Sequence, residues 1–116
     1  MIPLPRAAVA ALLVITAACS PSSQEEPAAS QALGEELYET RCAMCHGMTG
    51  AGDMPMAAGY PNANLIDQRW AHGPEKEALV RVIRDGLPGT PMLGFGRMMS
   101  PEEIDAVAEY VRGLSR

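Results

Sequence analysis

The sequence predicts a small all-α domain of three to four helices joined by long loops. Apolar residues recur at helical spacing in segments 32–41, 74–84 and 101–114, and no segment shows the sustained alternation of a β-strand. The connecting segments 47–64 and 86–99 are rich in Gly, Pro and Met. Loops this long are uncommon in a helical bundle, so we expect them to enclose something other than side chains.

The first residues resemble a bacterial export signal. Residues 1–18 carry one charge, Arg6, ahead of an apolar run that is too short to span a membrane. The run ends in Thr16-Ala17-Ala18-Cys19, which is similar to the lipobox of bacterial lipoproteins. An odd cysteine in an exported protein needs such an explanation, so we expect Cys19 to be lipidated. The alternative is an ordinary signal peptide that is cut near Ala18.

A linker is expected to follow the lipidated cysteine. Residues 19–30 contain no large apolar side chain and therefore predict a flexible tether, with the folded domain at residues 31–116. The formal net charge is −5, and the acidic excess lies early in the mature chain. This balance argues against nucleic acids and anionic membrane surfaces as partners.

The three helical segments each have a recognisable apolar side. In residues 32–41 it consists of Leu33, Leu37 and Tyr38, and in residues 74–84 of Leu79, Val80, Val82 and Ile83. The last helix has the clearest start, because Ser100 suits the N-cap, Pro101 the first helical position and Glu103 a capping box. Its stripe is Ile104, Val107, Ala108, Val111 and Leu114.

The motif that carries the chemistry is Cys42-Ala43-Met44-Cys45-His46. A CxxCH is the attachment pattern for c-type haem: the two thiols bind one porphyrin and the adjacent histidine binds its iron. A thioredoxin-like CxxC is disfavoured because the preceding segment is helical. A zinc site from Cys42, Cys45 and His46 or His72 lacks a second pair of ligands at the usual spacing. A structural disulfide is the remaining alternative.

With this motif in place, residues 31–116 resemble a class I cytochrome c domain. The resemblance implies an all-α cytochrome c fold, with helices and long loops wrapped around one covalent haem. It also implies that a Gly and an aromatic residue let the first and last helices cross at close range. Gly34 and Tyr110 are the candidates for that crossing.

The same resemblance implies a methionine as the sixth iron ligand. The segment Thr90-Pro91-Met92 with a following Phe95 is similar to the family's ligand loop, although Leu93 replaces the usual proline. Met92 is therefore the candidate, and Met98 and Met99 are the alternatives. A soft thioether favours ferrous iron and closes the coordination sphere.

Other positions are candidates around the cofactor. The second nitrogen of His46 needs a carbonyl acceptor, and the resemblance points to Pro61 or Ala63. Trp70 and Arg69 are candidates to bind a haem propionate, and packing at the rim is the alternative for Trp70. Met44, Met48, Met54 and Met56 are expected around an exposed haem edge.

These features together predict a carrier of single electrons, not an enzyme. The expected location is the periplasm, on a lipid anchor, and Ser20 after the lipidated cysteine favours the outer membrane. The expected partners are redox proteins of a periplasmic or membrane electron-transport chain. The alternatives are a haem-based sensor or peroxidase-like domain with a labile sixth ligand, and a dedicated cytochrome subunit of a periplasmic dehydrogenase or reductase.

Overall fold

The domain is built from four α-helices and two short 3-10 turns. The computed structural model describes residue 3 and residues 25–115. In chain order the elements are α1 (Glu25–Arg41), α2 (Ala43–His46), η1 (Pro55–Ala57), η2 (Pro61–Ala63), α3 (Lys76–Asp85) and α4 (Pro101–Gly113). No strand occurs among these residues, so the predicted all-α class is confirmed.

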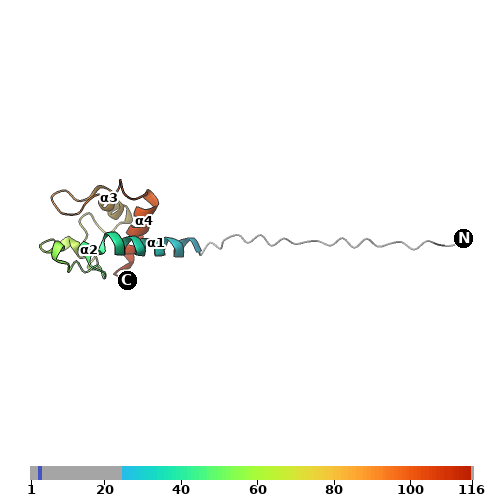
Figure 1. Ribbon diagram of the computed structural model, residues 1–116, viewed down its shortest axis with the longest axis horizontal. Helices are drawn as coiled ribbons and strands as arrows, with labels where there is room; N and C mark the ends of the chain where they lie inside the picture. The colour runs from blue at the N-terminus through green and yellow to red at the C-terminus, as the bar shows by residue number, and fades with distance from the viewer. Residues whose placement is uncertain (1–2, 4–24, 116) are drawn as a thin grey trace.

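Helices α1 and α4 cross at the centre of the fold (Figure 1). Gly34 is buried at the crossing, and a Cβ atom there would collide with the Ala106 carbonyl and lie 3.0 Å from Tyr110 Cβ. The Tyr110 ring packs on Tyr38, with the ring centroids 5.2 Å apart. The expected close crossing at Gly34 and Tyr110 is therefore confirmed.

The core surrounds this crossing and includes one face of α3. Its buried members are Leu37, Tyr38, Ala43, Leu65, Leu79, Ile83, Met99, Ile104, Val107, Ala108 and Val111. The start of α4 has the predicted capping box: Ser100 Oγ accepts from the Glu103 N–H, and Glu103 accepts from the Ser100 N–H. Because both bonds satisfy N–H groups that the first turn would leave free, the helix begins at a fixed residue.

Helix α1 begins earlier than the sequence predicts. It starts at Glu25, so residues 25–30 are helical where the composition suggests a flexible tether. The physical reason is local: Glu25 and Glu26 favour the positive end of a helix, and Ala28 and Ala29 are strong helix formers. Residues 25–33 are all exposed, so this extension contributes nothing to the core.

The predictions for the N-terminal region are not tested, and the middle helix begins later than expected. Residues 4–24, which contain most of the expected signal and Cys19, lie outside the described residues. Helix α3 begins at Lys76, two residues after the expected start at Pro74. Within residues 25–115, no helix combines the length and the apolar composition needed to cross a membrane.

Candidate functional site

One turn of helix carries both thiols and the histidine of the CxxCH motif. The Cys42 carbonyl accepts from the Cys45 N–H at 3.1 Å and from the His46 N–H at 2.9 Å. Residues separated by three and four positions share one face of a helix, so Cys42, Cys45 and His46 lie on the same side. Both thiols are half-buried, and no disulfide joins them in the structure.

The protonation of Cys42 distinguishes this turn from a redox-active CxxC. Burial raises the pKa of the Cys42 thiol to about 11; Arg41 opposes the shift and Cys45 adds to it. Thioredoxin-like sites do the opposite and lower the pKa of the attacking thiol. The thiol is therefore neutral at neutral pH, and α1, not a strand, precedes it. Both observations disfavour the thioredoxin alternative.

The imidazole of His46 is oriented by a backbone carbonyl. Its Nδ1 lies 2.8 Å from the Ala63 carbonyl oxygen, at the end of η2. A carbonyl only accepts, so Nδ1 carries the proton and Nε2 keeps its lone pair for a metal. The acceptor is thus Ala63 and not Pro61, and the arrangement is the one that metal-binding histidines use.

The donor set of this turn fits a c-type haem. Two free thiols and an imidazole with an available Nε2 share one half-buried helical face, as covalent attachment and iron ligation by adjacent residues require. A zinc site is not supported, since the described residues contain no group of three His, Cys, Asp or Glu side chains suited to a metal. His72 lies exposed in a turn.

The three methionines that are candidates for the sixth ligand have different surroundings. Met99 is buried in the core at 6% exposure, whereas Met98 is 53% exposed. Met92 lies between these extremes, half-buried at the edge of the core. The burial of Met99 assigns it to packing, and Met92 is the one that a loop presents at the core's edge.

The loop that carries Met92 is tied to itself and to α3. The Leu87 N–H donates to the Met92 carbonyl at 3.1 Å, and the Met92 N–H donates to Thr90 Oγ1 at 3.2 Å. Farther along, the Phe95 N–H donates to the Ile83 carbonyl at 2.8 Å. These bonds fix both ends of the short segment that contains Met92.

Close backbone approach between this loop and α3 depends on glycines. A Cβ at Gly94 would lie 2.8 Å from the Arg84 carbonyl oxygen, and one at Gly86, which has φ +78°, would lie 2.8 Å from the Met92 carbonyl oxygen. The sequence predicts Gly86 as the stop of the preceding helix and Gly94 only as a loop residue. The available signal for the close approach was that both glycines follow the end of a predicted helix.

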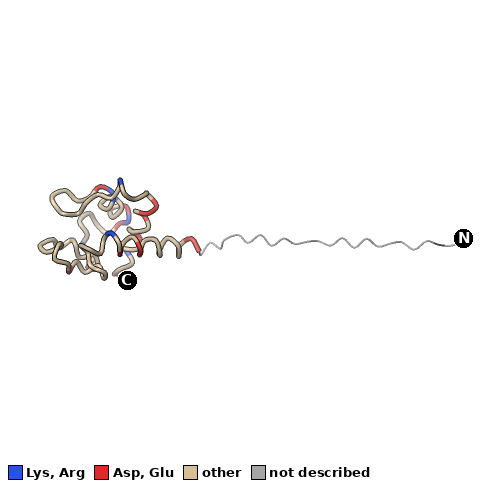
Figure 2. The backbone as a smooth tube through the Cα atoms, viewed as in Figure 1, with Lys and Arg blue, Asp and Glu red and all other residues tan. Residues whose placement is uncertain are grey.

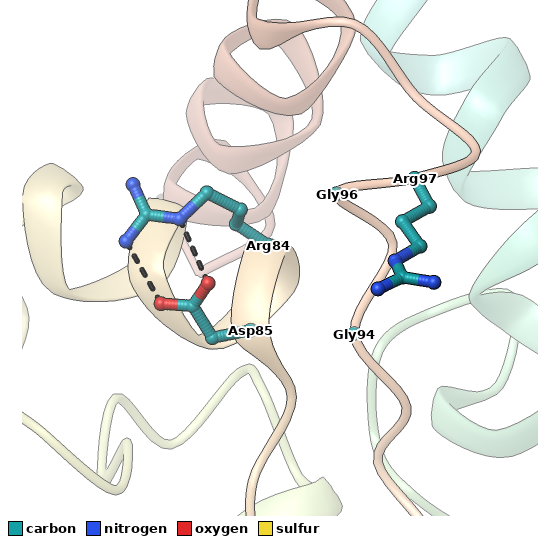
Figure 3. Close-up of a pocket in the computed structure, with 5 residues that line it drawn as sticks. All are labelled: Arg84, Asp85, Gly94, Gly96 and Arg97. Atoms are coloured by element: carbon teal, nitrogen blue, oxygen red, sulfur yellow. Dashed lines mark hydrogen bonds and ion pairs between the residues drawn. The ribbon is translucent and has the colours of Figure 1, made fainter.

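A shallow groove beside this contact does not belong to the haem-binding turn. Figure 3 shows its lining residues, which include Gly94, Gly96 and Arg97 on the loop side. Arg84 bonds both carboxylate oxygens of Asp85, and that contact holds the pKa of the Asp85 carboxyl below its ordinary value. The pair is exposed and joins sequence neighbours, so it contributes little to stability.

The structure gives Trp70 a different bond from the one that the resemblance implied. Its indole N–H donates to the Leu65 carbonyl at 2.9 Å, and its ring packs against the core. This agrees with the rim-packing alternative, because the N–H already has a protein acceptor. Arg69 is exposed, and its backbone N–H donates to Asp67, so a role for its side chain at a propionate stays a prediction.

One contact at the site was missed by sequence reasoning. The Tyr38 hydroxyl donates to the Gly47 carbonyl at 2.8 Å, directly after the CxxCH turn. The sequence indicates only that Tyr38 lies on the apolar side of its helix. A helical period shows which face of the helix a tyrosine lies on, but it does not show which acceptor its hydroxyl reaches.

Comparisons with known proteins identify the family of the chain. Residues 29–111 match the family described as cytochrome c oxidase, cbb3-type, subunit III. Among its relatives, the cbb3-type cytochrome c oxidase subunit FixP of Bradyrhizobium sp. (strain ORS 278) is 39% identical over 95 residues, which cover 76% of this chain and 31% of that protein. Subunit CcoP of Rubrivivax gelatinosus is 34% identical over 86 residues, or 74% of this chain and 26% of that protein. The chain thus spans less than a third of these relatives' length.

Solved structures of similar fold include other c-type cytochromes. The c-type cytochrome KustC0563 superimposes with a TM-score of 0.62 at 29% identity, covering 72% of this chain and 98% of that one. Cytochrome c6 from the diatom Phaeodactylum tricornutum gives a TM-score of 0.60 at 28% identity, covering 73% of this chain and 93% of that one. The family match over residues 29–111 and the CxxCH turn agree, so the chain belongs to the family of cbb3-type oxidase subunit III and is a class I c-type cytochrome.

Proposed function

We propose that the chain carries single electrons through one haem c, attached to Cys42 and Cys45 and ligated by His46 and Met92. The sequence contains one CxxCH, which is the reason to propose one haem. The observation that carries the proposal is the hydrogen bond from His46 Nδ1 to Ala63, which leaves Nε2 for iron beside two free thiols. The haem, when bound, supplies an iron that gains and loses one electron.

Ligation by Met92 supports the role of a carrier rather than a catalyst. The loop around Met92 is closed by two hydrogen bonds and is tied to α3, so its thioether is presented from a fixed backbone. If His46 and Met92 both bound the iron, they would leave no coordination position for a substrate. A soft thioether also raises the reduction potential.

The surface around the CxxCH turn supports electron exchange by apolar contact. Met44, Met48 and Met56 are 64%, 60% and 57% exposed, and α2 packs against η1, which brings Met44 and Met56 onto neighbouring elements. From residue 42 to residue 66, Asp53 is the only Asp, Glu, Lys or Arg. In Figure 2 this segment is correspondingly almost all tan. Flexible thioethers on a nearly neutral surface suit brief docking of a redox partner.

We further propose that the domain is tethered in the periplasm and serves a membrane electron-transport complex. Lipidation at Cys19 would hold it at a membrane, with the outer membrane favoured by Ser20. The relatives are subunits of cbb3-type oxidases, which favours a second candidate role as a dedicated subunit of an oxidase or reductase. Purification from detergent-solubilised native membranes separates the two: a stable stoichiometric complex indicates a subunit, and an isolated lipoprotein indicates a shuttle.

Carbon monoxide titration of the reduced protein tests the closed coordination sphere. Under anaerobic conditions the wild-type protein should bind carbon monoxide poorly, because Met92 occupies the position that the gas needs. Met92→Ala should bind it readily, and the matched control Met98→Ala, an exposed methionine farther along the same segment, should behave as wild type. Rapid and tight binding by the wild-type protein would contradict the carrier role and favour the haem-sensor or peroxidase-like alternative.

A further inference from the structure

Tyr38 is a fully buried tyrosine that joins the helix crossing to the CxxCH turn. Its side chain has 0% exposure, and its ring packs on Tyr110 of α4. A buried hydroxyl without a partner is costly, so the place where it bonds is tightly specified. It donates at 2.8 Å to the carbonyl of Gly47, the residue directly after His46.

Backbone hydrogen bonds close a turn around His46, and the Tyr38 hydroxyl of α1 adds a further bond to this turn. The His46 carbonyl accepts from the Gly52 N–H at 2.8 Å, and the Gly47 carbonyl accepts from the Gly50 N–H at 3.1 Å as well as from Tyr38. Gly47 has φ +78°, and a Cβ there would lie 2.5 Å from Asp53 Oδ1. The peptide after His46 therefore has little freedom once the Tyr38 hydroxyl is in place.

Two separate contacts thus control the direction of the histidine. The Ala63 carbonyl fixes the ring through Nδ1, and Tyr38 fixes the Gly47–Met48 peptide, one residue beyond His46. The ring of Tyr38 is itself held in the α1–α4 crossing beside Gly34 and Tyr110. The orientation of that peptide is therefore coupled to the packing of α1 against α4.

We infer that the Tyr38 hydroxyl is a positioning group for His46: through the Gly47 carbonyl it holds the backbone from which the imidazole is presented to the haem iron. The inference rests on the proposed ligation by His46. It assigns separate roles to two parts of one side chain: the ring packs the helices, and the hydroxyl orients the ligand.

The test is Tyr38→Phe in the full-length, haem-loaded protein, with Tyr110→Phe as the matched control. Each variant removes one hydroxyl from the same pair of rings and leaves an aromatic ring in place, but only Tyr38 is bonded to Gly47. The first readout is the electron paramagnetic resonance spectrum of the ferric protein, together with the paramagnetically shifted proton resonances of the His46 ring. The second is amide hydrogen exchange at His46, Gly50 and Gly52, with amides of α3 as the internal reference.

Tyr38→Phe should shift the ferric spectrum and the His46 ring resonances. In this variant the amides of His46, Gly50 and Gly52 should exchange about fivefold faster than in the wild type, while the α3 amides stay unchanged. This is the change expected from the loss of one buried hydrogen bond (about 1 kcal/mol). Tyr110→Phe should leave both readouts at wild-type values. Replacement of Tyr38 by 4-aminophenylalanine, which restores a donor on the ring, should return the spectrum toward wild type.

Two results would overturn the positioning role. One is a Tyr38→Phe protein with lower stability in urea but a wild-type ferric spectrum, which would show packing alone. The other is equal effects of Tyr38→Phe and Tyr110→Phe on both readouts. If the wild-type protein itself showed no low-spin ferric signal with histidine ligation, the proposed function would fail as well, so the two failures can be told apart.

Discussion

The close crossing of α1 and α4 makes Gly34→Ala a sharp test of the fold. The added Cβ would collide with the Ala106 carbonyl oxygen, lie 2.8 Å from the carbonyl carbon and 3.0 Å from Tyr110 Cβ. Two of these three neighbours are backbone atoms of α4, which no rotamer change can move. The helices would have to separate by roughly an ångström, and every contact of the close-packed crossing would loosen with them.

The expected magnitude follows from two opposing effects. Overpacking a core costs about 1–3 kcal/mol, and the rigid obstacle places this site at the upper end. Replacing a helical glycine by alanine returns about 1 kcal/mol through helix propensity. Gly34→Ala should therefore lower the free energy of unfolding by about 2 kcal/mol, which for a domain this small lowers Tm by roughly 10 °C.

The assay is urea unfolding of the haem-loaded protein, followed by far-UV circular dichroism. The matched control is Gly113→Ala in α4, where an added Cβ meets nothing within 4 Å. That variant should be as stable as the wild type or gain up to about 1 kcal/mol. A Gly34→Ala protein with an unchanged or higher urea midpoint would refute the crossing geometry.

Three further predictions concern the pH response, the start of α4 and the Met92 loop. Burial raises the pKa of the Tyr38 phenol above its ordinary value of 10.0, so the folded chain retains a proton that the unfolded chain loses above that pH. The contribution of this group to stability is therefore complete below about pH 10 and falls as the pH rises further. Above pH 10 the urea midpoint of Tyr38→Phe should decline less steeply with pH than that of the wild type. Identical slopes for the two proteins would contradict the raised pKa. Ser100→Ala removes the capping hydroxyl and should lower the free energy of unfolding by about 1 kcal/mol, whereas Glu103→Gln keeps a capping-box partner and should lose less; an unchanged urea midpoint for Ser100→Ala would count against the cap. Gly94→Ala would push the loop that carries Met92 away from the end of α3, so the reduced protein should gain carbon monoxide binding. If this variant bound the gas as poorly as the wild type, the contact between Gly94 and α3 would not be what holds Met92.

Much of the fold was predictable because the relevant signals are local or depend on close packing. The capping box of α4 needs only Ser100 and Glu103 at fixed spacing, and the structure has both bonds. The crossing at Gly34 was implied by the resemblance to class I cytochromes c, and the structure has this close contact. The start of α1 escaped prediction because residues 25–33 bury nothing, so hydrophobic periodicity gives no signal there.

At the site, residue types were predictable but the partners of polar atoms were not. The CxxCH spacing identifies Cys42, Cys45 and His46, whose shared face follows from helical geometry. The acceptor for His46 was narrowed only to Pro61 or Ala63. The direction of the backbone carbonyl changes from one residue to the next in a turn, and the sequence does not give these directions. Likewise, the indole N–H of Trp70 was a candidate donor to a haem propionate, with packing at the rim as the alternative, and in the fold it donates to the Leu65 carbonyl at 2.9 Å.

Covalent bonds from Cys42 and Cys45 to one haem underlie the whole of the proposed function. The measurement is the mass of the denatured polypeptide, matured with cytochrome c export machinery and extracted with acidified organic solvent. We predict that the pigment stays with the chain and adds the mass of one haem, and that Cys42→Ala with Cys45→Ala abolishes this addition. Pigment that passes into the solvent, or a colourless chain of unmodified mass, would contradict the central claim.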